Sequence, residues 1–315
     1  MTYAYDPELL PLVDALPAAS LDDIDAARDG LQQLVEPMNA HVDLTGVTIT
    51  DHQAPGPEGA PDVHVRVYAP DGGAPAGGRP ALVDIHGGGF VVGSIEMEHA
   101  FAAHVARELG VVVAAVEYRL APEHPFPAGI EDCYAALTWL HKNATELGLD
   151  VERIGVGGQS AGGGLTAGTV LLARDRGGPP VCFQVLGIPE LDHRLETPSM
   201  RAFVDTPMWH RGNAIKSWQM YLGPDHDGAV SPYASPSIAE DLAGLPPTYL
   251  TTMEFDPLRD EGIHYALRLL EAGVNVELHS FPGTFHGSSM LPVAEVSKRA
   301  SDELLVALRR GLRVS

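Results

Sequence analysis

From Ala81 onward, short apolar runs alternate with longer segments of helical character. The runs expected to form strands are residues 81–85, 111–118, 153–158, 181–188, 248–253 and 274–281. Because these runs are apolar at most positions, both faces of each strand must be covered, as in a parallel sheet with helices on either side. Helical segments such as 131–148 supply the crossovers between such strands. The pattern predicts a doubly wound α/β fold.

The residues before this alternation predict a helical region and then two further strands. Residues 7–39 carry apolar residues at helical spacing, and Ser20 is the expected N-cap of a helix there. Two β-branched runs, 42–50 and 63–70, are separated by a segment rich in proline and glycine. These runs predict an antiparallel pair. With the later strands they give a mostly parallel central sheet of about eight strands.

One segment, residues 190–225, interrupts the alternation with aromatic and methionine residues but no expected strand. An insertion after the carboxyl end of a strand lies where α/β sheets bind ligands. We therefore expect residues 1–40 and 190–225 to form a helical cap on a catalytic domain of residues 41–189 and 226–315. The candidate substrate-binding residues in the insertion are Phe203, Met208 and Trp209. The alternative is that these apolar side chains only fill a small core.

Composition excludes several classes of partner. The 315 residues carry a formal charge of −22, which repels nucleic acids and anionic membranes. No apolar stretch approaches the length of a membrane span, and no basic segment precedes an apolar run at the N-terminus. Cys133 and Cys182 lack metal-ligand spacing and are expected to be reduced thiols. These features predict a cytoplasmic protein without a metal site.

The segment Gly158-Gln159-Ser160-Ala161-Gly162 has the pattern G-x-S-x-G. It follows an expected strand and opens a helix of small residues, which is the context of a nucleophile elbow. Such a turn holds its serine in a strained conformation at the end of the sheet. Glycine is expected on either side because a Cβ atom there would clash with the neighbouring strand and helix. The motif predicts Ser160 as a nucleophile.

A serine nucleophile needs a base, and the base needs an acid that fixes its tautomer. His286 lies directly after the run 274–281 and is the candidate base. Asp256 lies just after the run 248–253, so we expect its carboxylate to hold His286. Glu254 is the main rival, and Asp260 is expected to lie already in the next helix. The order Ser160, Asp256, His286 is the order of α/β-hydrolases.

The loop that follows residues 81–85 begins with His86-Gly87-Gly88-Gly89. An HGGG loop directs backbone amides at a developing oxyanion, and it is a more specific signal than G-x-S-x-G. We interpret His86 as a residue that braces this loop rather than as a base.

The motifs HGGGF, YRLAPEHPFPA, GQSAGG, DPLRDEG and a late FHG occur in this order. Together they closely resemble the microbial branch of the hormone-sensitive-lipase-like carboxylesterases, in the α/β-hydrolase superfamily. The resemblance is strong over residues 80–315 and loose before them. It implies a serine hydrolase of short-acyl esters with a helical cap. It also implies an oxyanion hole formed by the backbone amides of Gly88, Gly89 and Ala161.

The resemblance has further implications. Family members often dimerise through the edge strand, here 274–281, which predicts a homodimer. Arg119 and Glu123, in the proline-pinned segment YRLAPEHPFPA, are read as structural support. The sequence departs from the family at Gln159, where the family usually has an acidic residue.

We therefore expect a serine carboxylesterase that acts on small-molecule esters with short- to medium-chain acyl groups, through an acyl-enzyme on Ser160. This chemistry needs no metal or organic cofactor. One alternative is a non-catalytic binder, because plant hormone receptors resemble this family but lack the triad histidine; His286 argues against it. A second alternative is an amidase or another acyl-transfer enzyme on the same residues. A triglyceride lipase is disfavoured because no large apolar surface patch is evident.

Overall fold

The computed structural model describes residues 3–13, 15–16, 20–224 and 228–314. Within them, one eight-stranded sheet has the order β1-β2-β4-β3-β5-β6-β7-β8. The strands are β1 Val47–Ala54, β2 Val63–Pro70, β3 Arg79–Ile85, β4 Val112–Glu117, β5 Leu149–Gln159, β6 Gln184–Gly187, β7 Thr248–Phe255 and β8 Val276–Phe285. The pairs β1–β2 and β2–β4 are antiparallel, and all pairs from β4 to β8 are parallel. The predicted α/β fold with a mostly parallel sheet is confirmed.

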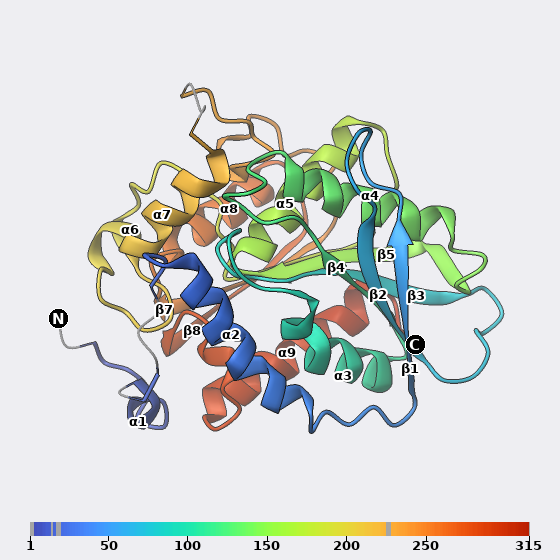
Figure 1. Cartoon of the computed structure of the whole chain (residues 1–315), viewed down its shortest axis with the longest axis horizontal. Helices are drawn as coiled ribbons and strands as arrows, with labels where there is room; N and C mark the ends of the chain where they lie inside the picture. Colours follow the sequence, from blue (N-terminus) through green and yellow to red (C-terminus); the bar gives the residue numbers. More distant parts are fainter. Residues whose placement is uncertain (1–2, 14, 17–19, 225–227, 315) are drawn as a thin grey trace.

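Helices lie along both faces of this sheet (Figure 1). The α-helices are α1 Leu10–Val13, α2 Ile24–Asn39, α3 His99–Leu109, α4 Ala128–Lys142, α5 Ala161–Asp175, α6 Pro198–Ala202, α7 Arg211–Leu222, α8 Arg259–Glu271 and α9 Glu295–Gly311. Three short 3₁₀ turns are η1 Ile95–Glu98, η2 Pro236–Ile238 and η3 Ser288–Met290.

Strand β4 shows why both faces must be covered. Val112, Ala114 and Val116 join the core cluster that includes α4, α5 and α8, whereas Val113 and Ala115 join the cluster that includes α3 and α9. Successive side chains of a strand point to opposite faces, so an apolar residue at every position needs helices on both sides. This is the arrangement that the apolar runs predicted.

The N-terminal region differs from the prediction of helix over residues 7–39. It contains a four-residue helix α1 and the longer α2, which begins at Ile24. The prediction of Ser20 as N-cap is wrong, because the side chain of Asp23 caps α2 by accepting from the amide of Ala26 at 3.0 Å. Ser20 Oγ instead accepts from the amide of Asp22 at 3.1 Å, within a turn before the helix.

Several strand boundaries also differ from the sequence prediction. Strand β1 spans Val47–Ala54 rather than 42–50, and β5 begins at Leu149 rather than at 153. Strand β6 is shorter than the run 181–188, and it ends where Ile188 adopts a positive φ of 39°. Strand β8 begins at Val276, because the amide of Val274 still closes α8 by donating to the carbonyl of Leu269 at 2.9 Å. It continues to Phe285, four residues past the predicted end at 281.

The two segments predicted as a cap pack together. Leu21, just before α2, shares an apolar cluster with Trp209 and with Ala214 of α7. That cluster also contains Val91, in the loop after β3. Figure 1 shows α2 (blue) and α6 and α7 (gold) toward the same side of the molecule. The boundary predicted between 225 and 226 lies outside the described residues.

Candidate active site

Ser160 stands between β5 and α5 in a strained backbone conformation, with φ 58° and ψ −122°. Its amide donates to the carbonyl of Gly187 at 2.8 Å, which ties the turn to β6. A Cβ atom added at Gly158 or at Gly162 would lie 2.4 Å or 2.0 Å from the carbonyl oxygen of Ile85. The glycines around Ser160 are therefore a steric requirement. Ser160 is only 7% exposed.

His286 follows the last residue of β8 and meets Ser160 at the carboxyl end of the sheet. The distance from His286 Nε2 to Ser160 Oγ is 2.9 Å. On the other side of the ring, His286 Nδ1 lies 2.7 Å from Asp256 Oδ2. An ionised carboxylate accepts the Nδ1 proton, which leaves Nε2 free to accept the serine proton.

Asp256 follows β7 and is almost fully buried, with 1% exposure. Its second oxygen, Oδ1, accepts from the amide of Leu258 at 2.9 Å. The two rival acids lie in other contacts. Glu254 Oε2 accepts from the amide of Gly283 at 2.6 Å, and Asp260 Oδ2 accepts from the amide of Ser199 at 2.7 Å. The structure thus brings Asp256, and neither rival, into hydrogen-bond contact with His286.

The loop after β3 begins with the HGGG motif, in which two glycines have positive φ, 116° at Gly88 and 56° at Gly89. A Cβ atom at Gly88 would lie 2.0 Å from the carbonyl oxygen of Val92, so the loop excludes a side chain there. A Cβ at Gly87 would lie 3.5 Å from Cβ of Ser160, which places the loop directly against the serine.

His86 is fully buried and stacks on Tyr118, with ring centroids 4.2 Å apart. Its Nδ1 lies 2.8 Å from the carbonyl oxygen of Gly87, and the Tyr118 hydroxyl donates to the carbonyl of His86 at 3.0 Å. Burial lowers the pKa of His86 to about 4. A neutral, stacked imidazole fits the expected role as a brace.

The three candidate substrate-binding residues lie at different places. Trp209 is close to the serine and histidine: its ring centroid is 5.9 Å from that of His286, and its ring fills the space beside Gly89. The Met208 side chain lies near Gly287, next to His286. Phe203 instead packs edge-on against Tyr3 and Phe255, at centroid distances of 5.7 Å and 6.1 Å.

The sequence reasoning missed two polar residues beside this site. Glu190 follows β6, and its amide donates to the carbonyl of Ser160 at 3.0 Å. Ser217 of α7 lies 2.9 Å from the carbonyl oxygen of Gly89 and 3.2 Å from Glu190 Oε1. The sequence did contain a signal for Glu190: an acidic residue directly after an apolar strand, in the segment GIPELD.

The supporting roles expected for the proline-pinned segment have clear partners. Arg119 forms an ion pair with the buried Asp132, at 2.7 Å between Nη2 and Oδ1. Glu123 pairs with Arg28 of α2 through two contacts of 2.7 Å and 2.8 Å. The second pair ties α2 to the segment between β4 and α4.

Gln159, the departure from the family, lies against β6. A Cβ atom added at Gly187 would be 2.9 Å from Cγ of Gln159. The neighbour of Ser160 is therefore an uncharged side chain that packs against the end of an adjacent strand.

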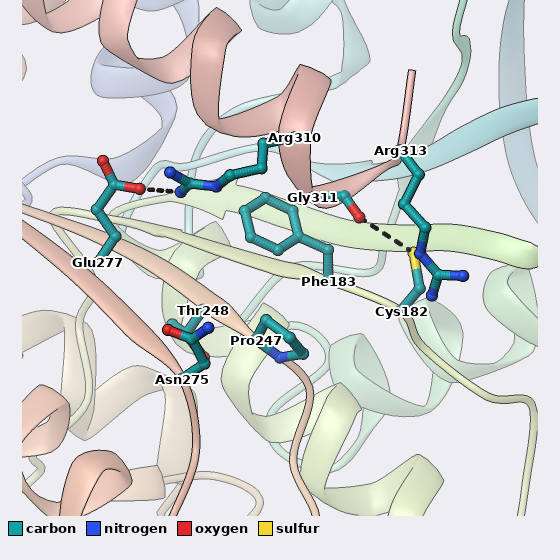
Figure 2. Close-up of a pocket in the computed structure, with 9 residues that line it drawn as sticks. All are labelled: Cys182, Phe183, Pro247, Thr248, Asn275, Glu277, Arg310, Gly311 and Arg313. Atoms are coloured by element: carbon teal, nitrogen blue, oxygen red, sulfur yellow. Dashed lines mark hydrogen bonds and ion pairs between the residues drawn. The ribbon is translucent and has the colours of Figure 1, made fainter. Parts of the chain in front are cut away.

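A separate pocket of about 480 Å³ lies at the amino ends of the parallel strands, opposite the candidate active site (Figure 2). Its lining includes Phe183, Thr248 and Asn275, which precede or begin β6, β7 and β8, whereas Ser160, Asp256 and His286 follow strands. Arg310 points toward Glu277 at its rim, and the two form an ion pair.

Residues 3–13, 15–16, 20–224 and 228–314 contain no cluster of three or more His, Cys, Asp or Glu side chains arranged to hold a metal ion. No helix in these ranges has the length and apolar character needed to cross a membrane.

Comparisons with known proteins agree with this geometry. Residues 82–290 match a family model described as the alpha/beta hydrolase fold. The chain is 38% identical over 312 residues to carboxylesterase NlhH of Mycobacterium tuberculosis, covering 98% of this chain and 96% of that protein. It is 37% identical over 310 residues to esterase LipI of the same organism, covering 97% and 95%.

Solved structures show the same likeness over nearly the whole chain. A bacterial heroin esterase superposes with a TM-score of 0.96 at 58% identity, covering 98% of each chain. Esterase LipW from Mycobacterium marinum superposes with a TM-score of 0.87 at 38% identity, covering 98% of this chain and 96% of that one. The chain therefore belongs to the α/β-hydrolase family, among the hormone-sensitive-lipase-like carboxylesterases.

Proposed function

We propose that this carboxylesterase uses Ser160 as nucleophile, His286 as general base and Asp256 as the acid that orients the base. The observation that carries the proposal is the continuous chain of contacts from Ser160 Oγ to His286 Nε2 at 2.9 Å and from His286 Nδ1 to Asp256 Oδ2 at 2.7 Å. A serine hydroxyl becomes a nucleophile when an adjacent base removes its proton.

The proposed cycle has two halves. In the first, Ser160 Oγ attacks the ester carbonyl carbon while His286 Nε2 takes the hydroxyl proton. The electron pair of the carbonyl π bond moves to the carbonyl oxygen. The carbonyl then re-forms as its bond to the alcohol oxygen breaks, the leaving alcohol takes the proton from His286, and an acyl-enzyme remains. In the second half, water replaces the serine as attacking group and the same proton transfers release the acid. The cycle requires no metal or organic cofactor.

We propose that the amides of Gly88, Gly89 and Ala161 stabilise the oxyanion. Two observations support this assignment. The loop with Gly88 and Gly89 lies directly against Ser160. Outside helices and strands, no described backbone oxygen accepts a hydrogen bond from any of these three amides. Donors aimed at the developing charge contribute about 2.7–4 kcal/mol each to transition-state stabilisation.

The substrates proposed are small-molecule esters with short- to medium-chain acyl groups. The bulky ring of Trp209 beside both Gly89 and His286 supports a small acyl pocket. Met208 is proposed to line the same pocket from the side of Gly287, and Phe203 to support it from the aromatic cluster with Phe255. The 58% identical relative is described as a heroin esterase, so an ester of a bulky alcohol belongs in the substrate panel.

The test is the variant Ser160→Ala combined with labelling. We expect kcat for p-nitrophenyl butyrate to fall by about 10⁶, the loss seen when a triad nucleophile is removed. A fluorophosphonate should modify the native protein at Ser160, identified by mass spectrometry of its peptides. A label on another residue, or an alanine variant with near-native activity, would show that the nucleophile has been misassigned.

The proposal has three further parts: a cap, a homodimer and a cellular location. Residues 1–40 and 190–225 are proposed to act together as a cap, supported by the apolar cluster that joins Leu21, Trp209 and Ala214. A homodimer through β8 is proposed because β8 is an edge strand of the sheet. A cytoplasmic location is proposed because both cysteines are free thiols, and cell fractionation tests it.

A further inference from the structure

Ser217 links the cap to the loop proposed as the oxyanion hole. It lies on α7 and is fully buried, as is Glu190. Its hydroxyl oxygen is 2.9 Å from the carbonyl oxygen of Gly89 and 3.2 Å from Glu190 Oε1. Three elements therefore meet at one hydroxyl group: the loop after β3, the segment after β6, and α7.

The number of protons shared by Ser217, Gly89 and Glu190 limits which hydrogen bonds they can form. A serine hydroxyl has one proton to donate, and a carbonyl oxygen can only accept. If Ser217 donates to Gly89, its contact with Glu190 is a hydrogen bond only when Glu190 carries a proton and donates to Ser217 Oγ. If Glu190 is ionised, both of its oxygens are acceptors, and it competes with Gly89 for the single hydroxyl proton.

The surroundings of Glu190 favour its neutral form. Its other oxygen, Oε2, is buried and has no hydrogen-bond partner among the described residues. The acidic and hydroxyl groups whose charges interact with it are Asp256 after β7, Glu261 of α8 and Tyr221 of α7. Burial raises the pKa of Glu190 to about 8; the contact with Ser217 lowers this pKa, and the charge of Asp256 raises it by a smaller amount.

We propose that Glu190 is a protonated carboxylic acid that acts through Ser217 to hold Gly89 in position, and thus positions the oxyanion loop for catalysis. This inference rests on the proposed function, because it assigns Gly89 to the oxyanion hole. Glu190 and Ser217 are positioning residues: their side chains act on the loop through the Gly89 carbonyl.

The consequence is a loss of activity at alkaline pH. As the pH rises past about 8, Glu190 releases its proton to solvent. The Ser217 hydroxyl then turns toward the carboxylate, and the Gly89 carbonyl loses its donor. Gly89 has a positive φ of 56°, and a glycine has wide backbone freedom, so without this hydrogen bond its amide direction becomes less fixed. Because the oxyanion exists only along the reaction path, kcat should fall more than KM changes.

The experiment is a pH profile of kcat and KM from pH 5.5 to 9.5 with p-nitrophenyl butyrate, corrected for spontaneous hydrolysis. For the native enzyme we expect kcat to fall about tenfold between pH 7 and pH 9.5. Glu190→Gln should remove this alkaline decrease, because its amide donates to Ser217 at every pH. Ser217→Ala should lower kcat about 10- to 100-fold at all pH values, less than the loss of about 10²–10³ that follows removal of an oxyanion donor itself.

Glu261→Gln is the matched control. Glu261 is also buried with a raised pKa, and it accepts from the amide of Leu191 at 2.6 Å, next to Glu190 in the chain. This variant should keep the native alkaline decrease. If Glu190→Gln retains that decrease, or if Glu261→Gln abolishes it, the relay is wrong.

Fluorophosphonate labelling of each variant at pH 7 separates this inference from the proposed function. Labelling at Ser160 together with an unchanged profile of Glu190→Gln would overturn the relay and leave the triad standing. Absence of label on native Ser160 would overturn both.

Discussion

At the scale of single residues, the carboxylate of Asp256 determines which nitrogen of His286 faces the serine. Its contact with Nδ1, at 2.7 Å, leaves Nε2 as the acceptor of the Ser160 proton. We expect Asp256→Asn to lower kcat by about 10⁴, because an amide favours the wrong tautomer of the histidine. Steady-state kinetics with p-nitrophenyl butyrate measures the loss.

Glu254→Gln provides the control for this prediction. Its carboxylate accepts from the amide of Gly283 of β8 and does not contact His286, so its loss should reduce kcat far less than the loss of Asp256. A larger effect at Glu254 than at Asp256 would mean that the acid has been misidentified.

Gln159 gives a prediction about the pH dependence on the acidic side. A carboxylate next to the nucleophile favours the protonated imidazole of His286, and protonated His286 cannot act as base. Gln159→Asp should therefore move the acidic limb of the kcat/KM profile to higher pH, and added salt should reduce the shift. Profiles at low and high ionic strength test this. A limb that stays in place at low salt would mean that the side chain at 159, lying against Gly187, acts only through packing.

At the scale of elements, the segment between α6 and α7 is expected to set the length of acyl chain that fits. Trp209 lies in this segment, against Gly89 and His286. Each methylene that fits contributes about 0.8 kcal/mol of binding, and a chain that is too long gains nothing further. We expect kcat/KM to peak between butyrate and octanoate esters and then to fall.

The variant Trp209→Ala tests the role of that ring directly. Removing the indole should shift the optimum toward longer acyl chains. A steady rise of kcat/KM through palmitate in the native enzyme would contradict a closed pocket, and an unchanged optimum in the variant would mean that another residue ends it.

At the scale of the whole molecule, the edge of the sheet at β8 is the expected contact between two copies of the chain. Leu278 of β8 is 37% exposed, and Leu270 of α8 and Val306 of α9 are 51% and 63% exposed. We expect a dimer in size-exclusion chromatography with light scattering, and Leu278→Lys should convert it to a monomer because it places a charge in the contact.

Leu34→Lys is the control, since Leu34 is 52% exposed on α2, on a different part of the chain. It should leave the dimer intact. A monomeric native protein would contradict the proposal, and so would a dimer that persists in Leu278→Lys.

The sequence by itself determined which strands and helices form and the order in which Ser160, Asp256 and His286 follow them along the chain. Apolar runs with helices between them require a sheet that is covered on both faces, and the glycines at 158 and 162 mark the tight turn at Ser160 because no side chain fits there. Local signals were weaker at element ends. Ser20 and Asp23 are both suitable N-caps, and only the path of the chain before α2 decided between them.

The tertiary structure decided which side chains meet. Glu254 and Asp256 are two residues apart, but an irregularity in the pairing of β7 with β8 falls between Met253 and Phe255, and only Asp256 contacts His286. Glu190 and Ser217 come together because α7 packs over the loop after β3. Contacts between distant elements depend on the packing of the whole core. Local spacing does not encode that packing, so it could predict a triad but not the residues that hold its surroundings in place.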